Sequence, residues 1–396
     1  MTQRQIVQGA AAVVALCLIL VGGGRVLTID RGLMVEPLIA GPVPATLYQP
    51  ANAEPGPLVI IAHGFAGSQQ LMQPFAVTLA RRGYSAVTFD FPGHGRHPDP
   101  LPDGVDDYDA LEQALFNALT TVEVAARSHV GDAAGLALVG HSMAADVAVK
   151  FAMAHPRIDA TVAVSLFFNA VSADHPRNLQ VIYGAFEPEM LVRQGRAVVD
   201  MAAPEGQPAT ANVTYGSFVD GTARRLILAG GVEHIGVLYS ADSLTAAAAW
   251  LDAAFGRDGN HDSPIDRRGG DLALMFLGLV LLAWPLSTLL PRITTTCDHK
   301  GDRRRPALGW RPLLAGIAVP MLATPLILRP MPTDFLPILL GDYLTLHFGL
   351  YGVITAGMLV WFARRGYPVT GGWRVAVKPA LVVGGLVLMY GAVVLG

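Results

Sequence analysis

Cysteine is nearly absent from the sequence. Its two cysteines, Cys17 and Cys297, both lie outside the globular middle of the chain, at roughly residues 35–256. A disulfide or a thiolate metal site needs paired or clustered cysteines. We therefore expect neither in the middle of the chain, and the cysteine content does not indicate a redox compartment.

Charge is scarce as well, and basic residues are not in excess. Charged residues make up 15% of the chain, and the formal net charge at pH 7 is −3. A nucleic-acid-binding protein needs a large basic surface to neutralise phosphates. This composition does not supply one, so we exclude nucleic acid as a partner. The sequence also has no internal repeat and no low-complexity tract.

Long apolar runs, in contrast, are abundant. Hydrophobic residues make up 52% of the chain and the mean hydropathy is +0.43, values typical of a protein with membrane spans. The first run, residues 6–27, follows Arg4. Gly22-Gly23-Gly24-Arg25 is a poor signal-peptidase site, and the residues before Cys17 do not suit a lipoprotein site. We favour an uncleaved anchor in residues 1–34 over a cleaved signal peptide.

Further apolar runs follow the middle region, after a hydrated linker at residues 258–270 that is rich in Gly, Asp and Arg. A spanning helix needs about 20 apolar residues, and most of these runs approach that length, the last being slightly short. We therefore expect about four transmembrane helices in residues 271–396. The runs are residues 272–290, 308–328, 335–362 and 380–395.

Two of these runs contain residues that disturb a simple helix. Pro320 and Pro325 predict a kink in the second run. The third is too long for one helix and contains Asp342 and His347, so a short re-entrant or interfacial piece followed by a span from about Tyr343 would fit it. Asp342 and His347 then mark either a polar path in the membrane or an interfacial position.

Basic residues near the spans predict the orientation of the chain. They gather in two connections, as Arg292, Lys300, Arg303, Arg304, Arg305 and Arg311 and as Arg364, Arg365, Arg374 and Lys378. Connections of this kind remain cytoplasmic. Counting back through the spans places the N-terminus inside and the middle domain outside. We therefore expect a multi-pass protein of the cell membrane with an extracytoplasmic domain.

The middle of the chain, residues 35–257, alternates short apolar runs with helical patterns. This alternation predicts an α/β domain with a doubly wound, mostly parallel sheet. We expect a strand that starts at Leu136 and ends in a tight turn, and other strands at residues 57–62, 84–90, 161–168, 179–183 and 225–229. Helices are expected at residues 69–82, 106–127 and 244–255.

The tight turn that ends the strand starting at Leu136 contains a serine that could act as a nucleophile. The apolar run leads into Gly140-His141-Ser142-Met143-Ala144 and then into a helical pattern. A serine on a tight strand-to-helix turn presents its hydroxyl above the sheet, and the next backbone N–H can face an oxyanion. Gly140 and Ala144 are the small residues that such a turn needs, although glycine is usual at the second of these positions.

An activated serine also needs a base, and an acid that orients the base. Glu187 follows the strand expected at residues 179–183, and His234 follows the last strand. The loops at the carboxyl ends of parallel strands converge at one edge of a sheet, so these residues would meet Ser142 there. Glu189 and Asp174 are alternative acids.

Together these motifs resemble the α/β-hydrolase superfamily, in its serine esterase and lipase-like branch. The resemblance covers residues 35–255. It rests on His63-Gly64 with Gly67-Ser68, on Asp90-x-x-Gly93-His94-Gly95, on the serine turn, and on the G-x-x-acid and G-x-x-His turns. The order serine, acid, histidine along the chain is also the order in that family.

The resemblance implies a role for each residue. Ser142 would be the nucleophile, His234 the general base and then acid, and Glu187 the orienting carboxylate, where the family more often has aspartate. The backbone N–H groups of Phe65 and Met143 would form the oxyanion hole.

The remaining histidines are expected to have supporting roles. His63 and His94 are expected to stabilise turns rather than to act as catalysts, and His141 to pack beside the serine or to line the substrate site rather than to act as a base. His63 is also expected among the residues that line the substrate. His94, His97 and Asp99 do not complete a set of ligands at metal spacing, so we expect no metal, and we expect no cofactor.

These roles predict acyl transfer to water through an acyl-enzyme on Ser142, with a small-molecule or lipid ester as substrate and membrane lipid as a partner. Serine in this position disfavours dehalogenation and cysteine-dependent lactone opening. Only residues 170–178 separate two strands where many such hydrolases carry a lid, so we expect an open site, shaped by residues 190–221 or by the membrane. An inactive binding or assembly module and an acyltransferase with the same three residues remain alternatives. The sequence assigns no protein partner.

Overall fold

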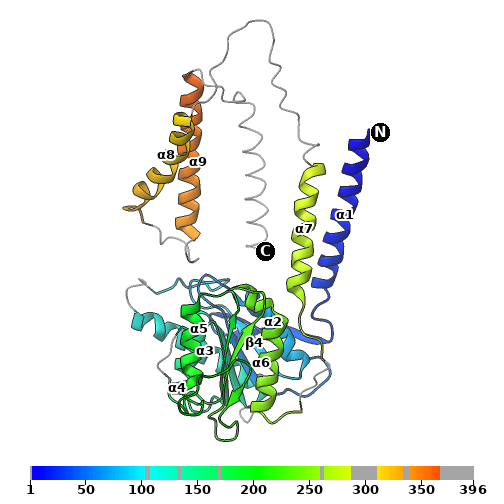
Figure 1. Cartoon of the computed structure of the whole chain (residues 1–396), viewed down its shortest axis with the longest axis vertical. Helices are drawn as coiled ribbons and strands as arrows, with labels where there is room; N and C mark the ends of the chain where they lie inside the picture. The colour runs from blue at the N-terminus through cyan, green and yellow to red at the C-terminus, as the bar shows by residue number, and fades with distance from the viewer. Residues whose placement is uncertain are drawn as a thin grey trace. The chain divides into compact units, whose positions relative to one another are not determined.

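The computed structural model describes residues 2–102, 108–131, 135–167, 171–258, 263–286, 310–332, 339 and 341–365. The chain divides into two compact units, the first formed by Met1–Leu282 and Pro337–Leu339, the second by Ala283–Leu336 and Leu340–Gly396. The first unit holds an α/β domain together with helix α1 (Gln3–Val26) and most of helix α7 (Arg268–Leu286) (Figure 1). The second holds helices α8 (Trp310–Leu328) and α9 (Gly341–Arg364), which pack against each other.

A sheet of nine described strands lies at the centre of the first unit, in the order β1-β2-β4-β3-β5-β6-β7-β9-β8. The six strands from β4 to β9 in this order are mutually parallel, whereas β1, β2 and β8 pair antiparallel with their neighbours. The parallel strands all end at one side of the sheet, which we call the carboxyl edge. The strands are β1 (Leu33–Ala40), β2 (Val43–Pro50), β3 (Leu58–Ala62), β4 (Ser85–Phe89), β5 (Leu136–His141), β6 (Ala160–Val164), β7 (Leu179–Gly184), β8 (Thr214–Tyr215) and β9 (Arg224–Ala229).

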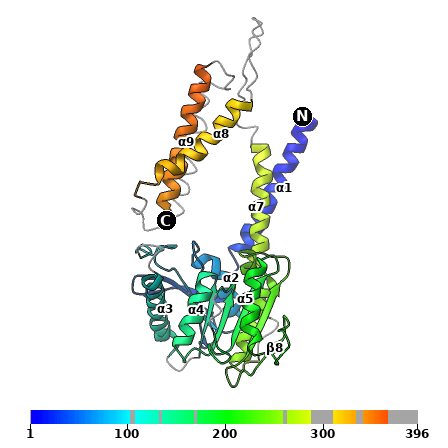
Figure 2. The same cartoon turned by 60° about the vertical axis from the view of Figure 1, so that its left-hand side comes forward.

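Helices cover both faces of this sheet (Figure 1 and Figure 2). Helices α2 (Gln69–Arg81) and α6 (Ala241–Ala254) cover one face, and α3 (Tyr108–Val130), α4 (Met143–Ala154) and α5 (Glu189–Asp200) the other. Side chains alternate along a strand, so Val59 and Ile61 of β3 pack toward α2 while Leu58 and Ile60 pack toward α3. Burial on both faces explains why these strands are apolar throughout.

The doubly wound, mostly parallel sheet expected from the sequence is confirmed. Each expected strand is found, with bounds that differ by a residue or two except for β6, which ends at Val164 rather than continuing to residue 168. Ser165 turns the chain out of the sheet there with a positive φ of 59°. The β1–β2 hairpin and β8, which all lie at the margins of the sheet, were not expected from the sequence.

Four of the described helices are long and apolar enough to cross a membrane: α1 (Gln3–Val26), α7 (Arg268–Leu286), α8 (Trp310–Leu328) and α9 (Gly341–Arg364). Pro320 and Pro325 both lie inside α8, as expected. In the third apolar run a single helix begins at Gly341, and before it residues 333–338 and 340 lie outside the described part of the chain. The expected span at residues 380–395 also lies outside the described residues. The domain boundaries and the membrane orientation stay predictions.

Helices α1 and α7 pack side by side in the first unit (Figure 1 and Figure 2). A Cβ atom on Gly278 would lie 2.8 Å from the carbonyl oxygen of Ala15, and one on Gly22 would lie 2.5 Å from the carbonyl oxygen of Asp271. Glycine therefore permits the close approach of the two backbones. Arg25 and Asp271 join the same two helices, with 3.4 Å between the guanidinium and the carboxylate.

Candidate active site

Ser142 lies at the carboxyl edge, in the turn between β5 and α4. Its backbone has φ 55° and ψ −119°, a combination that non-glycine residues rarely adopt. A Cβ atom on Gly140 would lie only 2.2 Å from the carbonyl oxygen of Ala144, so this strand and helix approach as closely as the sequence pattern indicates. The turn is therefore strained and holds the serine hydroxyl above the sheet.

His234 lies between Ser142 and Glu187. Its Nε2 atom is 3.0 Å from the Oγ of Ser142, and its Nδ1 atom is 3.0 Å from Oε2 of Glu187. The three side chains come from the turn after β5, the loop after β7 and the loop after β9, which the parallel sheet brings to one edge. The carboxylate accepts a hydrogen bond from Nδ1–H, which leaves Nε2 free to accept the hydrogen bond of the serine hydroxyl.

The carboxylate of Glu187 is held on three sides. Its Oε1 accepts the backbone N–H of Gly184 at 2.9 Å and the hydroxyl of Ser165 at 2.7 Å, and its other oxygen faces His234. Burial alone would raise the pKa of Glu187, but the hydrogen bonds from His234, Gly184 and Ser165 outweigh burial and lower it. Glu187 is therefore ionised at neutral pH.

The same hydrogen bond acts in the opposite direction on His234. Glu187 stabilises the protonated imidazole and raises the pKa of His234, whereas partial burial acts to lower it. The net shift is upward. An imidazole that gains stability on protonation is suited to take a proton from a neighbouring hydroxyl.

Neither alternative acid lies against His234. The side chain of Asp174 is 64% exposed and contacts Ser172 and His175. Glu189 begins helix α5 and is exposed. Of the three carboxylates considered from the sequence, only Glu187 contacts the imidazole.

The backbone N–H groups of Phe65 and Met143 have no acceptor among the described residues. Met143 directly follows the serine. The loop that carries Phe65 also lies against it, because a Cβ atom on Gly64 would be 3.0 Å from the Cβ of Ser142. These are the two groups that the sequence assigns to an oxyanion hole.

His63 lies beneath the site rather than on its surface. It is fully buried, its Nδ1–H donates to the carbonyl of Gly64 at 2.8 Å, and its Nε2 accepts the N–H of Phe91 at 3.1 Å. Burial lowers the pKa of His63 to about 4, so the ring is neutral. The structure does not bring His63 to the substrate side, where the sequence analysis expected it, because both of its ring nitrogens bind backbone.

His141 is also buried, and it supports the loop of His234. Its Nε2–H donates to the carbonyl of His234 at 2.9 Å, and the two rings have centroids 4.9 Å apart. Burial lowers the pKa of His141 to about 4. With 3% of its surface exposed, His141 offers little area to a substrate.

The carboxylate of Asp90 holds two segments near the serine in place through hydrogen bonds to their backbone. Its carboxylate accepts the backbone N–H of Gln69 at 2.7 Å and that of Arg96 at 3.1 Å. A Cβ atom on Gly95 would lie 2.3 Å from this carboxyl group, which explains the glycine. The Asp90 turn therefore holds the start of α2 and the loop after β4.

Ser165 also belongs to the candidate site, and its role was not predicted from the sequence. It is buried directly after β6, and its hydroxyl points at the carboxylate that faces His234. A polar residue at the end of a buried apolar strand was the available signal. The apolar residues that follow it, Leu166 and Phe167, made the strand appear to continue.

Residues 53–210 match a family described as serine aminopeptidase, S33. This stretch contains β3 to β7 and the serine turn. The fold is of the α/β-hydrolase type. The histidine loop after β9 lies beyond the matched residues, so the family match does not reach His234.

Solved structures that resemble the chain include one bacterial hydrolase, one archaeal hydrolase and one plant enzyme. A putative dienelactone hydrolase from Klebsiella pneumoniae is 19% identical, with 57% of this chain and 98% of that chain covered and a TM-score of 0.41. A predicted CIB-like hydrolase from Thermoplasma acidophilum is 13% identical, with coverage of 57% and 98% and a TM-score of 0.41. An epoxide hydrolase from Vigna radiata is 24% identical, with coverage of 35% and 39% and a TM-score of 0.27.

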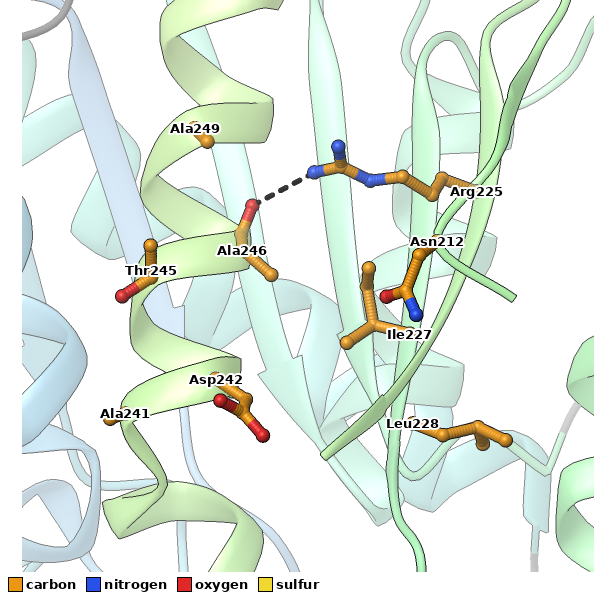
Figure 3. Close-up of a pocket in the computed structure, with 9 residues that line it drawn as sticks. All are labelled: Asn212, Arg225, Ile227, Leu228, Ala241, Asp242, Thr245, Ala246 and Ala249. Atoms are coloured by element: carbon orange, nitrogen blue, oxygen red, sulfur yellow. Dashed lines mark hydrogen bonds between the residues drawn. The ribbon is translucent and has the colours of Figure 1, made fainter. Parts of the chain in front are cut away.

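A cavity of about 500 Å³ lies elsewhere, between β9 and α6 (Figure 3). Its two charged side chains are already paired: Arg225 donates to Gln180 at 2.8 Å and to the carbonyl of Ala246 at 3.1 Å, and Asp242 accepts the N–H of Gly230 at 3.0 Å. None of the residues that line it is Ser142, His234 or Glu187. The chemistry therefore lies outside this cavity.

Proposed function

We propose that this protein is a membrane-anchored serine hydrolase of the carboxylesterase or lipase-like kind. The observation that carries the proposal is the continuous hydrogen-bonded chain from Ser142 through His234 to Glu187. Serine is a weak nucleophile by itself, and this arrangement is the one that activates it.

The proposed reaction has two halves. As the Oγ of Ser142 forms a bond to the ester carbonyl carbon, Nε2 of His234 takes the hydroxyl proton. The backbone N–H groups of Phe65 and Met143 stabilise the oxyanion. His234 then returns the proton to the departing alcohol as the ester C–O bond breaks. Water, deprotonated by His234, then attacks the acyl carbon. The bond from that carbon to Oγ breaks, His234 returns the proton to Oγ, and the carboxylic acid leaves.

Glu187 keeps its negative charge throughout. It holds the imidazole in the tautomer that accepts from Ser142, and it stabilises the imidazolium that forms in each half-reaction. The buried donors on its far oxygen, Gly184 and Ser165, prevent the carboxylate from rotating away.

Four apolar helices support the membrane part of the proposal, since α1, α7, α8 and α9 each have the length and composition of a span. The expected orientation places the α/β domain outside the cytoplasm. An insertion assay with reporters fused at the N-terminus and in the domain would test this orientation.

A second candidate is hydrolysis of an N-terminal peptide bond, which the description of the matched family favours. The same three residues perform amide hydrolysis on other folds. Comparing p-nitrophenyl butyrate with an aminoacyl p-nitroanilide would separate the two activities. Faster turnover of the anilide would replace the esterase assignment.

The first experiment is labelling of the full-length protein in detergent or nanodiscs by a fluorophosphonate probe. We expect the wild type to be labelled, and Ser142→Ala and His234→Ala to lose the label. A folded wild type that does not react would instead support an inactive binding or assembly module. Transfer of the acyl group to added alcohols, measured after labelling succeeds, would indicate an acyltransferase.

A further inference from the structure

Large apolar side chains are exposed on the loops, and on the start of helix α5, at the same edge of the sheet as Ser142. Five such residues follow four different parallel strands, and 45% to 71% of each is exposed: Phe65 after β3, Phe167 after β6, Phe186 and Met190 after β7, and Ile235 after β9. We call them the apolar rim. All lie at the carboxyl edge, because that is where the parallel strands end.

Residues of the apolar rim are sequence neighbours of Glu187 and His234, and one of them is hydrogen-bonded to the helix that follows Ser142. Phe186 directly precedes Glu187, and Ile235 directly follows His234. The backbone N–H of Phe167 donates to Asp146 at 2.8 Å, in the first turn of the helix that Ser142 begins. Exposed apolar groups gathered around one point mark an interaction surface.

Helix α7 leaves the domain at this same edge. Residues 263–268 run antiparallel along α2: Ser263 donates to the carbonyl of Arg81 at 3.2 Å, the Asp266 N–H donates to Thr78 at 3.0 Å, and Arg268 binds the side chain of Gln73. Because α2 starts at the carboxyl end of β3, this order of contacts leads toward the carboxyl edge.

The first turn of α7 then meets the histidine loop. A Cβ atom on Gly269 would lie 2.8 Å from the Cβ of Tyr239. Tyr239 closes the short 3-10 helix Gly236–Tyr239, which directly follows the loop of His234. Helix α7, which is apolar and long enough to span a membrane, therefore begins next to the loop that carries His234, the proposed general base.

Helix α1 ends beside the same half of α2. Its last residue, Val26, borders a cavity of about 260 Å³ together with Gln73, Val77 and Arg268. The Arg25–Asp271 pair joins α1 and α7 at this level, and charged residues of this kind lie at the end of a span rather than within it. Both helices thus reach the domain on the side where the apolar rim is exposed.

We propose that the apolar rim contacts the surface of the bilayer, and that Ser142 takes esters whose acyl chain lies in the bilayer. This inference rests on the proposed function, since it names the substrate class of the same serine. The bonds made and broken are those given above, with an alcohol or lysolipid as the leaving group. A long acyl chain drawn into water exposes every methylene, whereas apolar side chains along the path keep those methylenes covered.

The test uses the full chain in phosphatidylcholine vesicles and two esters with one leaving group. p-Nitrophenyl acetate is water-soluble, and p-nitrophenyl palmitate dissolves in the vesicles. The variant Phe167→Ser/Phe186→Ser removes two exposed rings. Its control is Val219→Ser, because Val219 is 89% exposed but lies between β8 and β9, at the opposite edge.

We expect the double variant to lower the ratio of palmitate to acetate hydrolysis by about tenfold, an effect of lost apolar contact. Val219→Ser should leave both rates unchanged. An unchanged ratio in the double variant would overturn the inference, and so would a wild type that cleaves acetate but not palmitate. A wild type that cleaves neither ester would instead count against the proposed function.

A second measurement does not depend on turnover. In a chain with Cys17 and Cys297 replaced by serine, Phe186→Cys and Val219→Cys each receive an environment-sensitive fluorophore. Lipids that carry a doxyl quencher near the headgroup should quench the label at position 186 and not at position 219. Equal exposure of both labels to the aqueous phase would show that the apolar rim does not touch the bilayer.

Discussion

The hydroxyl of Ser165 and the imidazole of His234 bind opposite oxygens of one carboxylate. Ser165 donates to Oε1 of Glu187 at 2.7 Å, and Nδ1 of His234 lies 3.0 Å from Oε2. The orientation of the proposed base thus depends on a residue on a neighbouring strand end that never meets the substrate. This relationship makes Ser165 a positioning residue.

Ser165→Ala should therefore slow turnover without changing the chemistry. A buried hydrogen bond to a charged group contributes about 1.5–3 kcal/mol, of which the part that orients the carboxylate would appear in kcat. We expect kcat to fall about tenfold with little change in KM, an estimate from that range. Ser172→Ala is the matched control, because Ser172 donates to the exposed Asp174. Equal kinetics for both variants would contradict a positioning role.

The pH dependence of ester hydrolysis should follow His234. Only the neutral imidazole accepts the serine proton, and Glu187 raises the pKa of His234 above its ordinary value of 6.5. The rise of kcat/KM with pH should therefore have its midpoint above 6.5. His63 and His141, with pKa values of about 4, should not contribute in that range.

Glu187→Gln should move this midpoint to lower pH. The largest cause of the raised pKa is removed, while burial, which lowers it, remains. We also expect kcat to fall on the order of 10³-fold to 10⁴-fold, since the amide favours the wrong tautomer. A midpoint that stays in place would show that another group titrates in the wild-type profile.

The same two pKa shifts predict how stability depends on pH. The raised pKa of His234 adds stability that is fully present below pH 6.5 and is lost as the pH rises through the folded-state pKa. The lowered pKa of Glu187 adds stability that is present above its ordinary value of 4.5 and is lost as the pH falls through the folded-state value. Thermal melts of wild type and Glu187→Gln across this range should converge at low pH.

Gly140 and Ala144, the two small residues of the serine turn, should differ in how well they tolerate substitution. Gly140→Ala places a Cβ atom 2.2 Å from the backbone carbonyl of Ala144, which no side-chain rotation relieves. We expect loss of fluorophosphonate labelling and a lower melting temperature. Ala144→Gly has no such contact and costs about 1 kcal/mol as a glycine in a helix. Labelling should survive it, and its loss would show that Ala144 has a role beyond being small.

Packing between α1 and α7 should depend on Gly278. Gly278→Leu would push a side chain into the backbone of Ala15 and separate the helices. Gly24→Leu is the control, because a Cβ atom on Gly24 meets nothing within 4 Å. We expect only the first substitution to lower the melting temperature in detergent. Equal melting temperatures would mean that the two helices do not stabilise each other.

The sequence predicted the centre of the sheet because burial on both faces requires uninterrupted apolar strands, which are easy to recognise. The β1–β2 hairpin does not have this pattern. Met34, Val35 and Ile39 are exposed apolar residues on β1, and Pro37 interrupts it, so apolar and polar positions do not alternate. Pro37 fits an edge strand, which needs fewer backbone donors.

The sequence predicted the residues of the candidate site whose type restricts them to a chemical role, as nucleophile, acid or base. Ser142, Glu187 and His234 follow the parallel strands β5, β7 and β9, and the sheet brings them together. Ser165 was missed because one serine after a strand is common, and neither its positive φ nor its hydrogen bond to Glu187 can be read from the sequence. The complete burial of His63 was also not predicted, because the residue types of the loop do not show whether the ring points into the domain or out of it.

The contact between Arg25 and Asp271 joins two residues that lie on opposite sides of the whole α/β domain in sequence. In topological terms, the domain is an insertion in the turn of a helical hairpin. Its entry and exit points are neighbours, which is the arrangement in which a domain can be gained, lost or exchanged as one piece. Joining α1 directly to α7 by a short turn should therefore leave the pair of apolar helices intact.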